Sequence, residues 1–209
     1  MGRWMWGLGV LLTAGVALAE PIDSKAARKM LFSPKGVKTE LVEGALNDQQ
    51  TALMKIILKG MKGEGLANYY GAIAVSPRFF EMVVSNPLPA AQSGLFQVVE
   101  RRHSIAAAES IALEACRRAA RAANVAPCVL AARILPKNFR SRDLTLSVTA
   151  TADFRDYRKA KAPKAFAISP RSRAFAFAHG DSAQSEALAA CNAAVEEEFP
   201  KDCVIVIAD

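Results

Sequence analysis

The four cysteines are the residues of this sequence whose type and spacing most clearly indicate a chemical role. Cys116 and Cys128 are 12 positions apart, and Cys191 and Cys203 are also 12 positions apart. Paired cysteines form structural disulfides in exported proteins, hold metal ions, or carry thiol redox reactions. A spacing of 12 lacks the Cys-x-x-Cys arrangement that is typical of structural zinc sites and of redox-active pairs. The spacing therefore favours structural disulfides, with metal and redox roles as the alternatives.

The two histidines, His103 and His179, lie 13 and 12 residues before the first cysteine of each pair. Two imidazoles can act as acid and base or share a metal ion. No carboxylate or nucleophile recurs beside both of them except Ser104 and Ser182, and helix capping already accounts for these serines. His103 and His179 are therefore weak candidates for a functional site, and the sequence identifies no catalytic residue.

Known motifs for a catalytic nucleophile, a cofactor or a metal ion are not found in the sequence. The sequence has no Gly-x-Ser-x-Gly elbow, no His-Glu-x-x-His zinc motif and no glycine-rich phosphate loop. The nearest approach, Gly60-x-x-Gly63-x-Gly65, follows a predicted helix instead of a strand, which favours a hinge. We expect no cofactor and no metal ion, and an enzyme is the less favoured class.

An internal similarity organises the chain. Residues 72–78 reappear as 165–171, residues 110–116 reappear as 185–191, and an apolar run follows the second cysteine of each pair. Because these features recur in the same order, we predict two copies of one unit. The similarity also selects one of the three possible cysteine pairings, in which each bond ties a helix to the strand that follows it. That pairing is Cys116–Cys128 and Cys191–Cys203.

Each copy is predicted to fold as strand–strand–helix–strand. Residues 72–75 and 165–168 alternate between small and large side chains, which is typical of a strand with one buried face. Second strands are expected at 95–99 and 174–178, and a final strand is expected after the second cysteine of each pair. The first copy holds extra residues, 79–93, which we interpret as a loop or an added hairpin.

The predicted class is α+β: two ββαβ repeats with an antiparallel sheet and packed helices, each closed by a disulfide and preceded by short N-terminal helices. We expect the repeats to share one sheet about a pseudo-dyad. The N-terminal helices are placed at 24–31 and 47–59, and a strand at 144–148 and a basic helix at 152–161 are placed between the repeats. The predicted divisions are a signal peptide (1–19), a helical segment (20–66), the first repeat (67–136), a basic connector (137–163) and the second repeat (164–209).

The first 19 residues have the pattern of an export signal. A positive start is followed by an apolar run at 4–18, and Ala17-Leu18-Ala19 suits a signal peptidase, so we predict cleavage after Ala19. An uncleaved membrane anchor is the alternative, although the apolar run is shorter than the ~20 residues that cross a bilayer. No later segment is long and apolar enough to span a membrane. The cleaved protein is expected to be periplasmic or secreted.

Charge is spread unevenly along the chain. Residues 20–116 carry a net charge of +1, residues 117–173 hold 14 basic and 3 acidic side chains, and residues 174–209 have a net charge of −6. The central stretch suits an anionic component of the cell envelope, and we expect no nucleic-acid partner. Pairing of this stretch with the acidic C-terminal segment is the alternative.

Length and composition exclude several classes of protein. The chain has 209 residues, of which 52% are hydrophobic and 22% are charged. This hydrophobic fraction is too high for a disordered chain, and the 10 prolines and 12 glycines are too few for a fibrous protein. An α/β barrel is excluded as well, because it needs about 250 residues.

The repeated residues resemble those of a family of small secreted bacterial domains of unknown function. That family has a Tyr-Gly-Ala-Ile-Ala segment, a helix ending in Ala-Leu-x-x-Cys and a second cysteine before a strand. Residues 70–74, 112–116 and Cys128 match the pattern once, and 187–191 with Cys203 match its second half again. The long insertion after Ser76 departs from it. The resemblance implies no catalytic residues.

The whole chain is also similar to short exported alphaproteobacterial proteins that sometimes carry the label 5-aminolevulinate synthase. That enzyme resembles a cytosolic pyridoxal-phosphate scaffold of about twice this length with a Schiff-base lysine. No lysine here takes that place, so the residues do not support this chemistry. The sequence predicts an exported, non-enzymatic binding or envelope-associated protein. A small hydrolase-like enzyme that uses His103 or His179 is the alternative, and a purely structural role is a third hypothesis.

Overall fold

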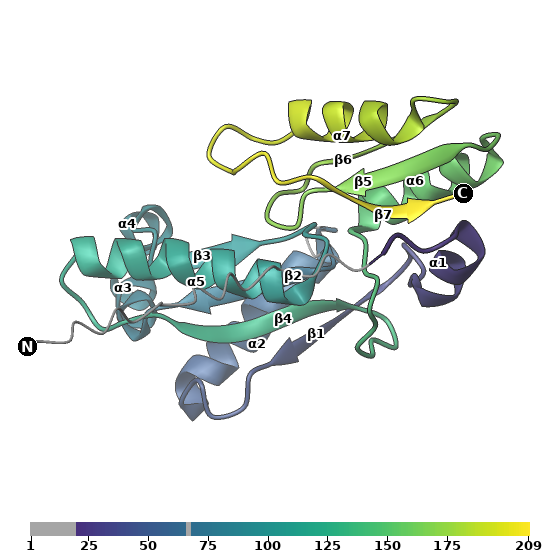
Figure 1. Ribbon diagram of the computed structural model, residues 1–209. Coiled ribbons are helices and arrows are strands. Elements are labelled where there is room, and N and C mark those ends of the chain that lie inside the picture. Colours follow the sequence, from purple (N-terminus) through teal and green to yellow (C-terminus); the bar gives the residue numbers. More distant parts are fainter. Residues whose placement is uncertain (1–19, 66–67) are drawn as a thin grey trace, which may run out of the picture.

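The computed structural model describes residues 20–65 and 68–209, so the predicted signal peptide lies outside the described residues. Within them the chain is an α+β protein with two antiparallel sheets, seven helices and two disulfides (Figure 1). The mixed class and the antiparallel pairing agree with the sequence. The expectation of one shared sheet is wrong, because each half of the chain builds its own.

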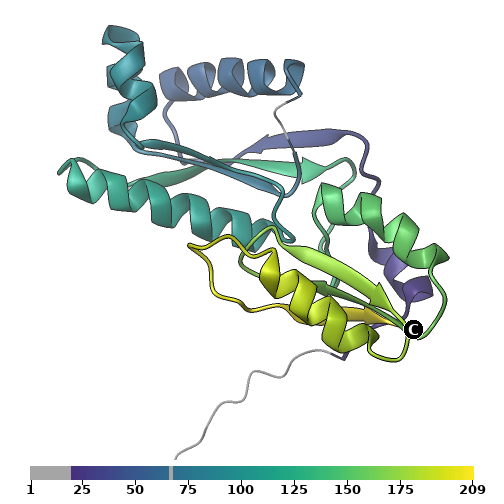
Figure 2. The ribbon, with the colours of Figure 1, turned by 90° about the horizontal axis from the view of Figure 1, so that it is seen from above.

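Sheet one has four strands and is covered on both faces. Helix α5 packs on one face, and α2, α3 and α4 lie on the other (Figure 2). The strand order is β1 (Val37–Leu41), β4 (Val129–Pro136), β2 (Gly71–Val75) and β3 (Phe96–Val99), and the helices are α2 (Asp48–Gly63), α3 (Pro77–Ser85), α4 (Pro87–Gln92) and α5 (Ile105–Ala122).

Sheet two has three strands in the order β6 (Phe175–His179), β5 (Lys164–Ile168) and β7 (Val204–Ala208). Helix α7 (Ala183–Ala193) covers one face, and α6 (Val148–Lys159) and α1 (Ser24–Met30) cover the other. In β5, Ala165 and Ala167 pack in the core under α7, and Phe166 and Ile168 pack in the core under α6. Every residue of β5 is buried, so the expectation of a single buried face is wrong.

The two sheets share a strand arrangement. In each, the strand that begins the predicted unit (β2 or β5) lies between the second strand (β3 or β6) and the last strand (β4 or β7). The pairing with the last strand shifts register between Ile73 and Ala74 in one sheet and between Phe166 and Ala167 in the other. These are equivalent positions in the internal similarity of the sequence.

The disulfides join Cys116 to Cys128 and Cys191 to Cys203, which confirms the predicted pairing. Cys116 lies in α5 and Cys191 in α7, and each partner lies just before the strand that returns beside its helix. Both helical cysteines are fully buried. Each bond therefore fastens the covering helix of one sheet to the final strand of that sheet.

The N-terminal segment, 20–66, is not only helical. Its two expected helices are present, and the Asn47 side chain caps α2 by accepting a hydrogen bond from the Gln50 backbone N–H (2.9 Å). Between them, however, β1 pairs with β4 along five residues and becomes the edge of sheet one. Ile22 adds a parallel bridge to Ile207 in sheet two. Sequence reasoning missed β1, although Val37, Thr39 and Leu41 alternate with charged residues as in a half-buried strand.

Two further expectations are wrong. Residues 79–93 form neither a loop nor a hairpin, because α3 and α4 occupy most of them, with Pro77 and Pro87 at the first helical positions. The expected strand at 144–148 does not form, because residues 144–147 pair with no strand of the described chain and Val148 already belongs to α6. The alternating apolar pattern of this segment arises because Leu144 and Leu146 are buried beside α6. Helix α6 starts at Val148, four residues earlier than predicted.

None of the helices in the described part of the chain is long and apolar enough to cross a membrane.

The disulfides should contribute similarly to stability. Removing either one, by Cys116→Ala with Cys128→Ala or by Cys191→Ala with Cys203→Ala, is expected to lower the free energy of unfolding by about 3 kcal/mol, because each bond restrains a loop of about 13 residues in the unfolded chain. Urea titrations of the two double variants against the parent provide the measurement. An unchanged midpoint in either variant would contradict this account.

Candidate binding site at the junction of the two sheets

His103 joins three segments that are distant in sequence. Its ring is buried, with 2% of the residue exposed, and lies between sheet one and sheet two. Nε2–H donates to the backbone carbonyl of Ala174 (3.0 Å), and Nδ1 accepts a hydrogen bond from the backbone N–H of Ser147 (3.2 Å). The ring also packs edge-on against Phe175. Because Ser147 is the N-cap of α6 and Ser104 is the N-cap of α5, His103 fixes the start of two helices against the start of β6.

The surroundings of His103 hold it neutral. Burial lowers the pKa of the imidazole to about 4, and hydrogen bonds with backbone groups of Ala174 and Arg173 oppose this shift only in part. Both ring nitrogens are engaged by backbone groups, so neither is available to move a proton of a substrate. His103 therefore has the geometry of a structural tie.

His179 lies elsewhere. It is exposed at the C-terminal end of β6, whereas His103 contacts the residues at the beginning of that strand. The structure does not bring the two imidazoles together. Among residues 20–65 and 68–209, no three side chains of the His, Cys, Asp and Glu types converge as a metal-binding group would.

Three arginines gather at the same junction, because they adjoin the residues that His103 ties together. Arg101 and Arg102 directly precede His103, and Arg173 directly precedes Ala174. Nε of Arg173 donates to Oε1 of Glu196 (2.7 Å). A hollow of about 360 Å³ at this junction is lined by Arg101, Thr149, Arg173, Ala174, Phe175, Ala194 and Glu196.

Arg102, which directly follows Arg101, is unusual for an arginine. Only 9% of the residue is exposed, and its Nε and Nη1 atoms, like Oε2 of Glu196, are buried without a hydrogen-bond partner in the described structure. The guanidinium carbon lies 4.9 Å from the ring centroid of Phe199, a cation–π distance. Burial lowers the pKa of Arg102, and the charge of Glu196 opposes that effect. Sequence reasoning missed this cluster, although the Arg-Arg-His tripeptide was a visible signal.

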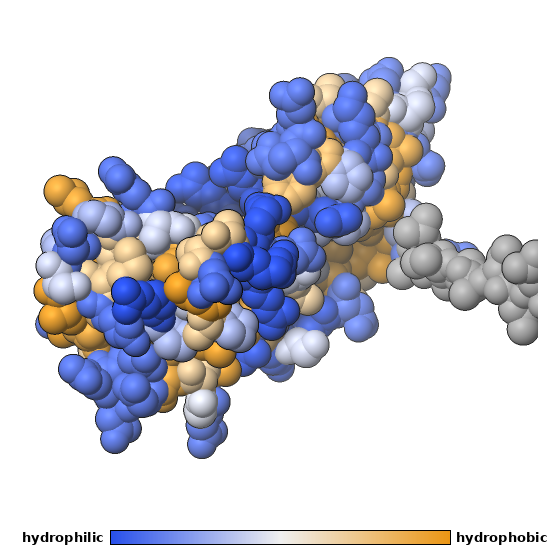
Figure 3. All heavy atoms as spheres, turned by 90° about the vertical axis from the view of Figure 1, so that its left-hand side faces the viewer, coloured by the Kyte–Doolittle hydropathy of each residue, from blue (hydrophilic) through white to orange (hydrophobic). Residues whose placement is uncertain are grey.

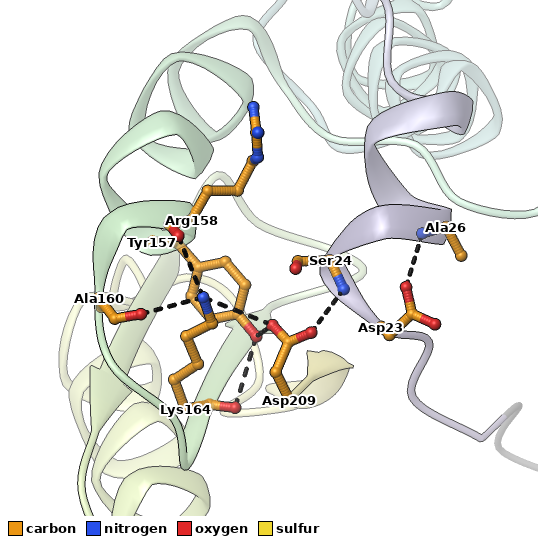
Figure 4. Close-up of polar contacts among 8 residues, drawn as sticks. All are labelled: Asp23, Ser24, Ala26, Tyr157, Arg158, Ala160, Lys164 and Asp209. Carbon is orange, nitrogen blue, oxygen red and sulfur yellow. Dashed lines mark hydrogen bonds and ion pairs between the residues drawn. The ribbon is translucent and has the colours of Figure 1, made fainter.

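A second polar cluster lies at the other end of sheet two, around Lys164 (Figure 4). The Lys164 ammonium is 8% exposed, and it donates to the carbonyls of Arg158 (3.2 Å) and Ala160 (3.1 Å) at the end of α6. It lies 3.7 Å from Oδ2 of Asp209, which also accepts a hydrogen bond from the Tyr157 hydroxyl (2.9 Å). Lys164 therefore caps the C-terminal end of α6.

Asp209 connects this cluster to the N-terminal helix, because its Oδ1 accepts a hydrogen bond from the backbone N–H of Ser24 (2.9 Å). Burial raises the pKa of Asp209, but the hydrogen bonds from Ser24 and Tyr157 and the charge of Lys164 outweigh it, and the net pKa is lowered. Burial and the neighbouring Asp209 together raise the pKa of Tyr157. The cluster joins α1, α6 and the C-terminal residue, and it has the geometry of a structural latch.

The basic stretch 117–173 is mostly free of the acidic C-terminal segment. Of its 14 basic residues, four form ion pairs in the described structure, namely Arg133, Lys159, Lys164 and Arg173. The partners of Lys164 and Arg173, which are Asp209 and Glu196, belong to the acidic segment 174–209, and the other two partners do not. Internal pairing therefore accounts for a small part of this charge.

The basic residues also do not form one surface. Figures 1 and 2 place the C-terminal half of α5 at one end of the molecule and α6 at the other. Three exposed arginines, Arg117, Arg118 and Arg121, lie in that half of α5. We call this end, together with α3 and α4, the arginine end.

Exposed apolar side chains accompany the arginines. Val84 of α3 and Leu88 of α4 are 72% and 75% exposed. The segments are neighbours, because the Ser76 hydroxyl at the start of α3 donates to the carbonyl of Ala126, just after α5 (2.7 Å). Figure 3 looks onto this end and shows strongly hydrophilic residues gathered beside hydrophobic ones. Cationic and apolar groups are thus presented on one end of the molecule.

Comparison of the chain with protein-family models, with curated proteins and with solved structures finds no match in any of the three.

His103 should make stability depend on pH. In the unfolded chain the imidazole titrates near its ordinary pKa of 6.5, and in the folded chain near 4, so protonation favours unfolding between these values. We expect the free energy of unfolding to fall by about 3 kcal/mol as the pH is lowered through this range. Urea titrations between pH 7 and pH 4 measure the effect. His103→Gln should flatten this dependence, and His179→Gln should keep it; a slope that survives in His103→Gln would refute the assignment.

The latch should lose stability when its carboxylate is removed. Asp209→Asn leaves the buried Lys164 ammonium without an anionic partner and is expected to cost about 2 kcal/mol at neutral pH. Because the pKa of Asp209 is lowered on folding, the parent should lose this contribution only as the pH falls through that lowered value. Thermal unfolding at neutral pH checks the cost, with Asp181→Asn, an exposed aspartate, as the matched control. Equal effects of the two substitutions would exclude a specific latch.

Proposed function

We propose that this protein is an exported binding protein, and that its arginine end associates with the anionic lipid surface of the cell envelope. The observation that carries the proposal is the unneutralised charge: Arg117, Arg118 and Arg121 are exposed and form no ion pair in the described structure. Arginines near an anionic membrane each contribute about 1 kcal/mol to binding.

The apolar residues of the same end support a lipid surface in particular. Val84 and Leu88 are large hydrophobic side chains that are mostly exposed, and a membrane interface accepts such groups alongside basic ones. The α6 region is a poorer candidate, because none of the large exposed hydrophobic side chains of the described residues lies on α6.

Export is part of the proposal. The apolar leader with cleavage after Ala19 is the sequence basis, and two disulfides with no membrane-spanning helix in the described residues are compatible with an extracytoplasmic protein. A hydrolase-like activity through His103 has less support, since both ring nitrogens of that residue bond to backbone groups.

We also infer that the two sheets descend from one ββαβ unit. The equal cysteine spacing, the common strand arrangement and the register shifts at equivalent positions support this inference. Under it, α3 and α4 are an addition to the first copy, and this addition supplies the apolar part of the arginine end.

Vesicle binding tests the function. The cleaved, disulfide-intact chain should sediment with vesicles of phosphatidylglycerol and phosphatidylcholine, and the binding should weaken as salt shortens the range of the charges. Arg117→Gln, Arg118→Gln and Arg121→Gln together should weaken binding by about 3 kcal/mol, or roughly a hundredfold.

The matched control is Arg155→Gln, Arg158→Gln and Lys161→Gln, which removes the same charge from the α6 region. That variant should keep most of the binding. Equal losses of vesicle binding in the two triple variants would mean that binding depends on net charge alone and not on the arginine end. Binding that is insensitive to salt would refute the proposal.

A further inference from the structure

A basic groove lies beside the free edge of sheet one. Strand β1 is the outermost strand of that sheet, and among the described residues it pairs only with β4 (Figure 1). The groove runs between β1 and α2 and has a volume of about 410 Å³. Two residues of the strand and four of the helix line it, namely Thr39, Leu41, Lys55, Leu58, Lys59 and Lys62. An open strand edge and a set of lysines therefore share one groove.

The backbone of β1 has hydrogen-bonding groups left for another strand. Val42, directly after β1, donates its N–H to the carbonyl of Ala131 (2.9 Å), and the register of the pair continues from there along β1. In an antiparallel pair such bonds involve every second residue. Val37, Thr39 and Leu41 therefore direct their N–H and C=O groups away from β4. An edge of this kind is a template for a further strand.

The positive charge of the groove is not neutralised by the fold. Lys55, Lys59 and Lys62 are spaced i, i+4 and i+7, so they share one face of α2. All three are exposed, and none forms an ion pair in the part of the chain that the structure describes. Among residues 20–65 and 68–209, no acidic side chain lines the groove. The groove therefore attracts an acidic partner.

The apolar part of the groove is recessed. Leu41 packs against the core of sheet one, and Leu58 belongs to that core and is only 6% exposed. Val84 and Leu88 of the arginine end protrude instead, and the exposed Ile56 of α2 does not line the groove. A membrane surface meets protruding groups, whereas an extended peptide can enter a groove and pair with its strand edge. The recessed floor therefore favours a peptide.

A second copy of this chain is a poor occupant. Pairing two β1 strands edge to edge would bring two sets of three lysines to the same place, and like charges facing one another are destabilising. The occupant with complementary charge is a segment that carries carboxylates. Because successive side chains of a strand point to opposite faces, carboxylates that all face α2 must occupy alternate positions.

We propose that β1 accepts an extended acidic segment of a partner protein as an additional strand of sheet one. Backbone hydrogen bonds to Thr39 and Leu41 hold the segment, and the three lysines of α2 select acidic side chains at its alternate positions. This surface shares no residue with the arginine end, so the inference goes beyond the proposed membrane binding.

A short peptide added to the full, disulfide-intact chain tests the proposal. The probe is acetyl-Thr-Glu-Thr-Glu-Thr-Glu-Thr-amide, and binding is followed by backbone NMR with amide hydrogen exchange. We expect saturable binding that slows the exchange of the Thr39 and Leu41 amide hydrogens, because the added strand accepts hydrogen bonds from them. A peptide that only neutralises the lysines would leave their exchange unchanged.

Modified peptides separate strand addition from charge. Acetyl-Thr-Thr-Glu-Glu-Glu-Thr-Thr-amide has the same composition without the alternation and should bind more weakly, and a version with lysine in place of glutamate should not bind. Two N-methylated versions of the probe, one methylated on the glutamates and one on the threonines, keep the charge. The version whose blocked N–H groups face β1 should lose binding, which also reports the direction of the added strand.

A variant of the protein tests the lysines. Lys55→Gln, Lys59→Gln and Lys62→Gln together should weaken binding of the probe about tenfold, because three solvent-exposed ion pairs of modest strength are removed. The α6 triple variant described above removes the same charge elsewhere and should keep the affinity. Since the three lysines are exposed, their variant is expected to fold, and its far-UV spectrum checks this.

Four results would overturn the inference. Binding without slowed exchange at Thr39 and Leu41, or equal binding of both N-methylated peptides and the probe, would mean that charge alone attracts the peptide. Absence of binding would mean that the lysines only guard a strand edge against aggregation. Absence of peptide binding together with weaker binding of the lysine variant to phosphatidylglycerol vesicles would assign the groove to the membrane surface. Failure of the arginine end to bind vesicles would leave peptide binding unaffected.

Discussion

The arrangement of the two sheets depends on one neutral imidazole that must be hydrogen-bonded at both nitrogens. His103 is buried where the halves of the chain meet, and its two bonds reach Ala174 at the start of β6 and Ser147 at the cap of α6. Because a buried polar group without partners is costly, the positions of these three residues are coupled. The same coupling brings Arg101 and Arg102, the two residues before His103, near Arg173, which directly precedes Ala174.

Within each half, small residues and a disulfide set the geometry. In sheet two, Ala165, Ala167, Ala183 and Ala187 form the layer between β5 and α7, and the bond from Cys191 to Cys203 closes that layer. Alanines let a helix approach a sheet closely but bury little apolar area each. A disulfide that restrains the unfolded chain is a reasonable complement to such a core. The opposite face carries the aromatic residues Phe154, Tyr157 and Phe166.

The charged groups of the protein serve two different purposes. At the Lys164 latch every charge has a nearby partner, and the result is a tie between the C-terminal residue, α1 and α6. At the arginine end, Arg117, Arg118 and Arg121 form no ion pair in the described structure, and this is where we propose binding to the membrane surface. The distinction is physical: a satisfied charge stabilises the fold, whereas an unsatisfied one has interaction energy left for a ligand.

The sequence by itself determined the local features. Cysteine spacing and internal similarity were sufficient for the disulfide pairing, and Asn47 and Ser104 marked two helix starts, because these signals act over a few residues or repeat along the chain. The tertiary structure alone decided that β1 joins sheet one, that residues 144–147 pair with no strand of the described chain, and that Arg101 and Arg173 lie at one hollow. Strand pairing and charge clustering depend on contacts between segments far apart in the chain, and no local pattern encodes the partner. His103 illustrates both sides: its residue type suggested chemistry, and only its two long-range backbone partners showed that it is a structural tie.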